Sequence, residues 1–145
     1  MAQDEGSSLP ITSMLKHGEI KILVIEDDKF LRELLVGKLK KEGYATTEAV
    51  DGEEGLGAAK KDPPHLIMLD LVLPGADGFE ILQDLKNNPN VSKVPVIVLS
   101  NLGSREDIDR ALSLGAKEFL VKAHHTPQEI VDTIKKVLDA SYFQK

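Results

Sequence analysis

Five polar side chains come directly after short apolar runs, and they comprise three carboxylates, a hydroxyl and an amine. They are Glu26 and Asp27 after Ile22–Ile25, Asp70 after Leu66–Leu69, Ser100 after Val94–Leu99, and Lys122 after Phe119–Val121. Carboxylates crowded together repel each other and raise each other's pKa values unless a cation lies among them. The set holds no soft ligand, so Mg²⁺ is the expected cation, with Mn²⁺ as a substitute.

Phosphoryl transfer is the chemistry that this set predicts. A carboxylate such as Asp70 is an accepted nucleophile and becomes an acyl phosphate. Mg²⁺ commonly joins one or two carboxylates to a phosphate, which is the role expected for Glu26 and Asp27. Lys122 would neutralise the phosphoryl oxygens, and Ser100 would donate a hydrogen bond to them.

Short apolar runs alternate with amphipathic stretches from Lys21 onward. The pattern predicts strands at 22–25, 44–47, 66–69, 94–99 and 119–121. It predicts helices from Phe30 until Gly43, over 53–61, over 78–87, and after the caps Ser104 and Thr126. Asp28 is interpreted as the N-cap of the first of these helices rather than as a metal ligand.

Five strands that alternate with five helices indicate an α/β protein with a doubly wound parallel sheet and helices on both faces. The strands are apolar almost throughout, as expected when both faces are covered. In such sheets the site lies beyond the carboxyl ends of the strands, where the five polar side chains fall.

The overall composition favours one ordinary domain. The chain has 145 residues, of which 41% are hydrophobic and 29% charged, and no cysteine. The net charge of −6 argues against direct DNA binding. The apolar runs are too short to span a bilayer, and no signal peptide is evident, so we expect a cytoplasmic protein. Residues 1–18 are expected to be a flexible extension, with a short helix at 11–17 as an alternative, and 19–145 to be the domain.

Four motifs in this order resemble the response-regulator receiver family of two-component systems, in particular a chemotaxis-type single receiver. They are Lys21-Ile-Leu-Val-Ile-Glu-Asp-Asp28, Leu66-Ile-Met-Leu-Asp-Leu-Val-Leu-Pro-Gly-Ala-Asp-Gly78, Val96-Ile-Val-Leu-Ser100 and Phe119-Leu-Val-Lys122. The resemblance covers about residues 21–140. It implies a flavodoxin-like fold with strand order 2-1-3-4-5.

The resemblance also implies a role for each site residue. Asp70 would be the phosphorylated residue, and Ser100 and Lys122 would hold the phosphoryl oxygens. The metal ligands would be Glu26, Asp27, Asp70 and the backbone carbonyl of Val72. Ser100 and Phe119 would form a switch pair, in which the aromatic ring moves inward when the hydroxyl moves toward the phosphate.

A histidine kinase or a histidine phosphotransfer protein would be the phosphoryl donor, and the protein would catalyse only its own phosphorylation and dephosphorylation. The fourth helix, fifth strand and fifth helix would contact a downstream protein, without a membrane or DNA. An Mg²⁺-dependent phosphohydrolase with an aspartyl-phosphate intermediate is one alternative, although Val72 stands where such enzymes typically place an acidic residue. A phosphorylation-independent interaction module is the other.

Four residues depart from the family pattern. Ala123 replaces the usual proline after the lysine, where the peptide bond is often cis, and Asn101 replaces a small residue. Val72 and Leu102 are apolar at positions that influence self-dephosphorylation in the family. We therefore expect a long-lived phosphoryl group.

Overall fold

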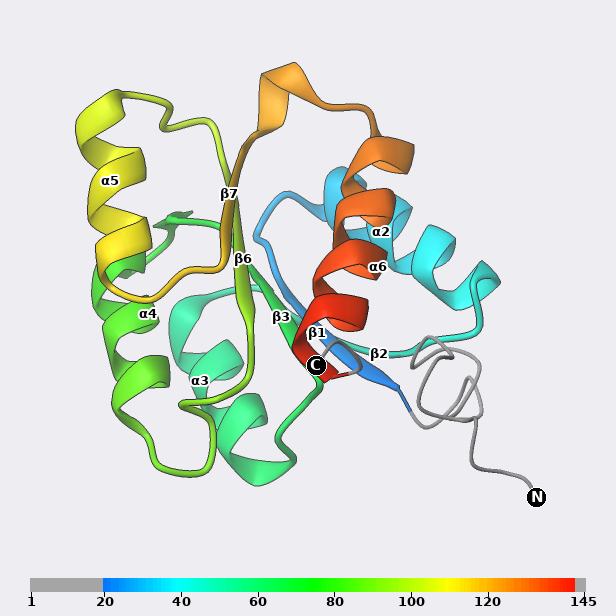
Figure 1. Ribbon diagram of the computed structural model, residues 1–145, viewed down its shortest axis with the longest axis horizontal. Coiled ribbons are helices and arrows are strands. Elements are labelled where there is room, and N and C mark those ends of the chain that lie inside the picture. The colour runs from blue at the N-terminus through cyan, green and yellow to red at the C-terminus, as the bar shows by residue number, and fades with distance from the viewer. Residues whose placement is uncertain (1–19, 143–145) are drawn as a thin grey trace.

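The computed structural model describes residues 20–142 (Figure 1). The expected extension at 1–18, with its alternative helix, lies outside the described residues, and the domain boundary remains a prediction. Five parallel strands make the main sheet: β1 (Lys21–Ile25), β2 (Ala45–Ala49), β3 (Leu66–Leu69), β6 (Val96–Ser100) and β7 (Glu118–Val121). Their order across the sheet is β2-β1-β3-β6-β7. Counted within this sheet, the order is the predicted 2-1-3-4-5.

Helices cover both faces of the sheet (Figure 1). They are α2 (Lys29–Lys41), α3 (Gly52–Lys61), α4 (Gly78–Asn87), α5 (Arg105–Ser113) and α6 (Pro127–Tyr142). Helices α2 and α6 lie on one face, and α3, α4 and α5 lie on the other. The structure therefore confirms the doubly wound, flavodoxin-like α/β fold.

Each face of the sheet packs into its own hydrophobic core, because successive strand residues point in opposite directions. Ile22 and Val24 of β1 belong to the core under α2 and α6, whereas Leu23 and Ile25 belong to the core under α3, α4 and α5. All four residues of β3 are buried. This explains why the central strands are apolar without alternation.

The predicted helix starts are confirmed by their caps. The side chain of Asp28 accepts a hydrogen bond from Leu31 N–H, and Ser104 does the same for Asp107. Thr126 and Glu129 form a reciprocal capping box: Glu129 N–H donates to Thr126 Oγ1, and Thr126 N–H donates to the Glu129 carboxylate. The entry to each helix is thus set by local side chains.

Two features of the loop after β3 were not predicted. Val72–Leu73 (β4) and Ala76–Asp77 (β5) form a small antiparallel hairpin around the predicted turn at Pro74-Gly75. Gly78 then lies against the backbone of Leu71, where a Cβ would approach Leu71 Cα to 2.3 Å. Only glycine fits there, and this contact presses the start of α4 against the residue that follows Asp70.

Two predicted strand boundaries need correction. The second strand lies at Ala45–Ala49 rather than 44–47, and the fourth at Val96–Ser100 rather than 94–99. The reason is that ladder pairing, not the apolar run, sets where each strand begins and ends: β2 pairs with β1, and β6 pairs with both β3 and β7. Phe30, the apolar residue at which the first helix is predicted to begin, is 78% exposed. It lies about 200° around the helix from the buried Arg32.

No helix in the described part of the chain is long and apolar enough to cross a membrane.

His65 ties the loop before β3 to the start of β1. Its ring Nδ1 accepts a hydrogen bond from the backbone N–H of Lys21 at 2.9 Å, and its backbone N–H donates to the Lys21 carbonyl at 2.8 Å. The hydroxyl of Tyr142, at the end of α6, donates to the His65 carbonyl. Burial, and next the charge of Lys21, hold the pKa of His65 below its usual value of 6.5.

This environment predicts a pH-dependent contribution to stability. The folded state favours neutral His65, so its contribution is complete above about pH 6.5 and is lost as the pH falls below that value. We expect His65→Asn, whose amide oxygen accepts the same bond without titrating, to weaken this acid-side loss. The measurement is the urea midpoint of unfolding for both proteins between about pH 5 and 7.5, which spans the usual range of histidine pKa values. Parallel curves over that range would contradict the prediction.

Candidate functional site

A pocket of about 290 Å³ opens at the carboxyl ends of the strands. It is lined by Glu26, Asp27, Asp28, Asp70, Val72, Asn101 and Lys122. These residues follow β1, β3, β6 and β7, so the parallel sheet brings together side chains that are up to 96 residues apart in sequence. Of the predicted residues, Ser100 and Phe119 are not among those that line the pocket.

Three carboxylates converge in this pocket. Glu26, Asp27 and Asp70 each offer an oxygen, and these oxygens all lie within 4.8 Å of one another. Glu26 is 2% exposed and Asp70 is 3% exposed, whereas Asp27 faces solvent. Burial raises the pKa of Glu26 to about 7, and the nearby charge of Asp70 adds to the rise. Burial and crowding thus disfavour the charged form of the cluster, and a positive partner is needed to keep all three acids ionised.

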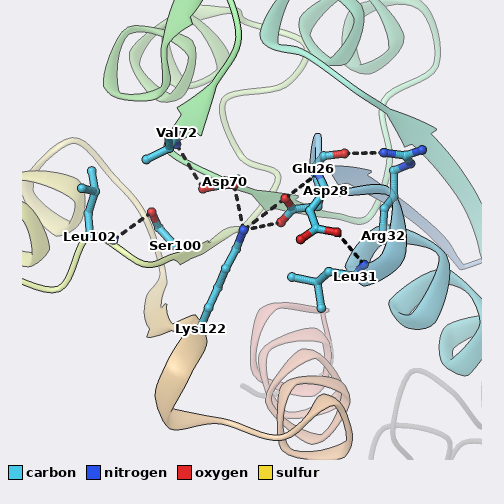
Figure 2. Close-up of polar contacts among 9 residues, drawn as sticks. All are labelled: Glu26, Asp28, Leu31, Arg32, Asp70, Val72, Ser100, Leu102 and Lys122. Atoms are coloured by element: carbon cyan, nitrogen blue, oxygen red, sulfur yellow. Dashed lines mark hydrogen bonds and ion pairs between the residues drawn. The ribbon is translucent and has the colours of Figure 1, made fainter.

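Lys122 supplies one positive charge (Figure 2). Its Nζ lies 2.9 Å from Asp70 Oδ2 and 2.9 Å from Glu26 Oε1. Burial lowers the pKa of Lys122, but the hydrogen bonds to Asp70 and Glu26 outweigh it, so the pKa lies above its usual value. The lysine is therefore an ammonium group that bridges two of the three acids.

The backbone fixes the Asp70 side chain between two donors (Figure 2). Val72 N–H donates to Asp70 Oδ1 at 3.0 Å, and Lys122 donates to Asp70 Oδ2. The N–H of Asp70 itself donates to the carbonyl of Ile25, which ties the residue to the end of β1. The carboxylate is thus held at the edge of the pocket in a defined orientation.

Ser100 and Phe119 lie beside this site. Ser100 is fully buried at the end of β6, and its Oγ accepts a hydrogen bond from Leu102 N–H at 3.3 Å. Phe119, on the neighbouring β7, is partly buried and packs against the core under α3, α4 and α5. The expected switch movement is not tested by one conformation and stays a prediction.

The replacement of proline by Ala123 does not displace the lysine. The Lys122–Ala123 peptide bond is trans. Residues Lys122–His124 form a single turn of 3₁₀ helix, and His125 N–H donates to Lys122 O. Lys122 still reaches both acids from this turn.

Arg32 is a site neighbour that the sequence analysis missed. It is 9% exposed, and its Nη1 donates to the Glu26 carbonyl at 2.8 Å. The sequence held one signal, because Arg32 precedes the buried Val36 by four residues and so shares its helix face.

A family comparison agrees with this geometry. Residues 22–135 match the model of the response regulator receiver domain. The chain belongs to the response-regulator receiver family. This receiver domain is a signalling domain, as the resemblance of its motifs implied.

Relatives of the receiver domain occur in several lineages. One is "Probable transcriptional regulator ycf27" of Porphyridium aerugineum, 39% identical over 118 residues, which cover 81% of this chain and 48% of that protein. The chemotaxis response regulator CheY4 of Vibrio cholerae has a TM-score of 0.76 and 27% identity, over 81% of this chain and 98% of CheY4. The Mn²⁺-bound form of response regulator Rcp1 has a TM-score of 0.68 and 26% identity, over 87% of this chain and 95% of Rcp1. This chain spans about half or less of the length of the curated relatives it matches.

Proposed function

We propose that this receiver domain takes a phosphoryl group onto Asp70 from a phosphohistidine of a partner protein, with Mg²⁺ bound beside it. The observation that carries the proposal is the placement of Asp70. This nearly buried carboxylate offers an oxygen within 4.8 Å of oxygens from two further acids, and it accepts a hydrogen bond from the half-buried ammonium group of Lys122. Such an arrangement suits a nucleophile whose charge must be balanced while it reacts.

The reaction proceeds by displacement at phosphorus. One oxygen of Asp70 forms a bond to the phosphorus, and the bond from phosphorus to the donor nitrogen breaks. The electron pair of that bond leaves with the donor imidazole, which takes up a proton from water. The product is an acyl phosphate on Asp70 and an unphosphorylated histidine on the partner.

The residues present fit a hard divalent cation. Glu26, Asp27 and Asp70 supply only oxygen donors, as Mg²⁺ prefers, and Mn²⁺ accepts the same donors. Val72 lines the same pocket, and its backbone carbonyl is the proposed fourth protein ligand. When bound, the ion supplies positive charge that balances the acids and the phosphoryl oxygens. The Mn²⁺ in the related Rcp1 structure supports this choice of metal.

Lys122 and Ser100 are proposed to hold the phosphoryl group. Lys122 already lies against Asp70 and would transfer one of its N–H donors to a phosphoryl oxygen. Ser100 would turn its hydroxyl from the Leu102 N–H toward the phosphate, and Phe119 would then move inward. This movement would alter the face formed by α5, β7 and α6, where we place the contact with a downstream protein.

Two alternatives have different chemistry at the same residues. A phosphohydrolase of this type needs a general acid near the nucleophile, and Val72 cannot serve. A phosphorylation-independent module would not need the buried acids and the lysine. We therefore propose that the domain is not an enzyme for other substrates. Two further predictions stay untested: that the domain acts in the cytoplasm, and that it does not bind DNA directly.

Acetyl phosphate, a small phosphoryl donor, separates the three candidates. The protein is incubated with acetyl phosphate and Mg²⁺, and its intact mass and the released phosphate are followed over time. One stable added phosphoryl group supports the proposed function. Rapid turnover to free phosphate would support the hydrolase, and an unchanged mass would support the interaction module.

The persistence of the phosphoryl group gives a further prediction. Val72 is 55% exposed at the pocket and Leu102 is partly exposed, and neither side chain can orient an attacking water. The double variant Val72→Asn, Leu102→Glu is therefore expected to lose phosphate faster than the wild type, by about 10²-fold if it gains one general base. The measurement is the decay of phosphorylated protein after removal of acetyl phosphate. Val72→Ala with Leu102→Ala is the control, and equal decay in all three proteins would rule the idea out.

A further inference from the structure

Four polar or charged residues are buried in the part of the chain that the structure describes: Glu26, Arg32, Asp70 and Ser100. Three of them belong to the candidate site by their position at strand ends. The fourth, Arg32, comes from the second turn of α2 and is 9% exposed. Arginine is rarely buried unless its guanidinium group is paired and hydrogen-bonded.

The guanidinium of Arg32 joins the acidic segment Glu26–Asp28, which follows β1, to strand β2. Its Nη1 donates to the backbone carbonyl of Glu26 at 2.8 Å (Figure 2), and its Nε donates to Glu48 Oε1 of β2 at 3.0 Å. The N–H of Glu26 donates to the carbonyl of Ala49, the last residue of β2. Both peptide groups of Glu26 are therefore anchored to the same end of β2.

We infer that Arg32 is a positioning residue that holds the Glu26 peptide in place and thereby keeps the Glu26 and Asp27 carboxylates directed toward the metal. This inference rests on the proposed function, because it takes Glu26 and Asp27 as metal ligands. The Glu26 carbonyl lies beyond β1, which ends at Ile25, so no strand partner replaces the Arg32 donor. The loop needs such a restraint because its two carboxylates and Asp70 repel one another.

A purely structural role for Arg32 would rest on its ion pair with Glu48. The Glu48 side chain is 42% exposed, and ion pairs open to water contribute little. The bond to the Glu26 carbonyl is buried, so it is the contact that matters more. Partners behind metal ligands typically affect metal affinity about 10–100-fold when removed.

The test measures the binding of Mn²⁺ alone by electron paramagnetic resonance, which reports the free ion. We expect Arg32→Met to bind Mn²⁺ about tenfold more weakly than the wild type, since the ligands themselves remain. Arg32→Lys, which offers no planar fork, should fall between the two. Glu48→Ala should lose less Mn²⁺ affinity, because Arg32 keeps its hydrogen bond to the Glu26 carbonyl and loses only its ion pair with residue 48. Val36→Ala is the control for weakened packing of α2, since Val36 is buried on the same helix face and belongs to the hydrophobic core under α2 and α6.

A second readout separates positioning from stability. Arg32→Met should need about tenfold more Mg²⁺ for half-maximal reaction with acetyl phosphate, yet reach the wild-type rate when Mg²⁺ saturates. Wild-type Mn²⁺ affinity in Arg32→Met, or an equal loss in Val36→Ala, would overturn the role of Arg32. If Arg32→Met fails to fold, Arg32→Lys and Glu48→Ala decide by the same criteria. If the wild type binds no Mn²⁺, the proposed metal site itself fails and the inference falls with it.

Discussion

Replacing Asp70 with Asn is expected to abolish the uptake of a phosphoryl group from acetyl phosphate. The amide has nearly the same shape as the carboxylate and still accepts a hydrogen bond from Val72 N–H, but it is not a nucleophile. Lys122 keeps Glu26 as its partner, so the pocket should not collapse. Intact mass spectrometry after incubation with Mg²⁺ gives the result directly.

Asp77→Asn is the matched control for this change. Asp77 is an exposed acid that caps α4 by accepting a hydrogen bond from Phe79 N–H, and Asn caps helices equally well. It should take up phosphate like the wild type.

Asp70→Asn should also raise the free energy of unfolding in the absence of Mg²⁺, because it removes one of three mutually repelling carboxylates. A phosphorylated Asp70→Asn protein would show that another residue is the acceptor.

Lys122→Met is expected to slow phosphoryl uptake about 10²–10³-fold, the cost of removing one donor to the developing charge in comparable sites. Among the described residues, Lys122 is the only one whose ammonium group donates a hydrogen bond to Asp70, and the change removes it. Methionine keeps most of the side-chain volume. The initial rate of mass increase with acetyl phosphate at saturating Mg²⁺ measures the effect.

Lys21→Met is the matched control for the loss of a lysine. Lys21 forms an ion pair with Asp62 at the opposite end of the sheet, 2.7 Å apart, and should not influence the rate. Lys122→Arg should recover part of the activity, because the positive charge is kept while its geometry changes. If the rate of Lys122→Met lies within a factor of about two of the wild-type rate, Lys122 does not stabilise the developing charge to the extent expected for such a donor.

The convergence of the acids and the lysine could be predicted because it follows from topology. Asp70 and Lys122 each come directly after an apolar strand, and parallel strands place their carboxyl ends at one edge. The fold class follows from the same alternation of strands and helices. Neither inference requires knowledge of how any side chain packs.

The remaining features depend on packing and pairing that the sequence does not display. Arg32 falls at a buried helix position although arginine is mostly exposed, and its partner Glu48 is brought near by the pairing of β1 with β2. The exposure of Phe30 shows the converse, because an apolar residue in the first turn of α2 faces away from the sheet. The β4–β5 hairpin consists of two-residue strands, too short for a periodic pattern to reveal.

Chemical location of the phosphoryl group tests most directly whether Asp70 is the phosphorylated residue. The wild-type protein is incubated with acetyl phosphate and Mg²⁺, treated with borohydride to reduce any acyl phosphate to the alcohol, digested and sequenced by mass spectrometry. We expect homoserine at position 70 in place of Asp70, and only when Mg²⁺ was present during the incubation. Reduction at Glu26 or Asp27, or a modified Asp70 without any metal, would contradict this expectation.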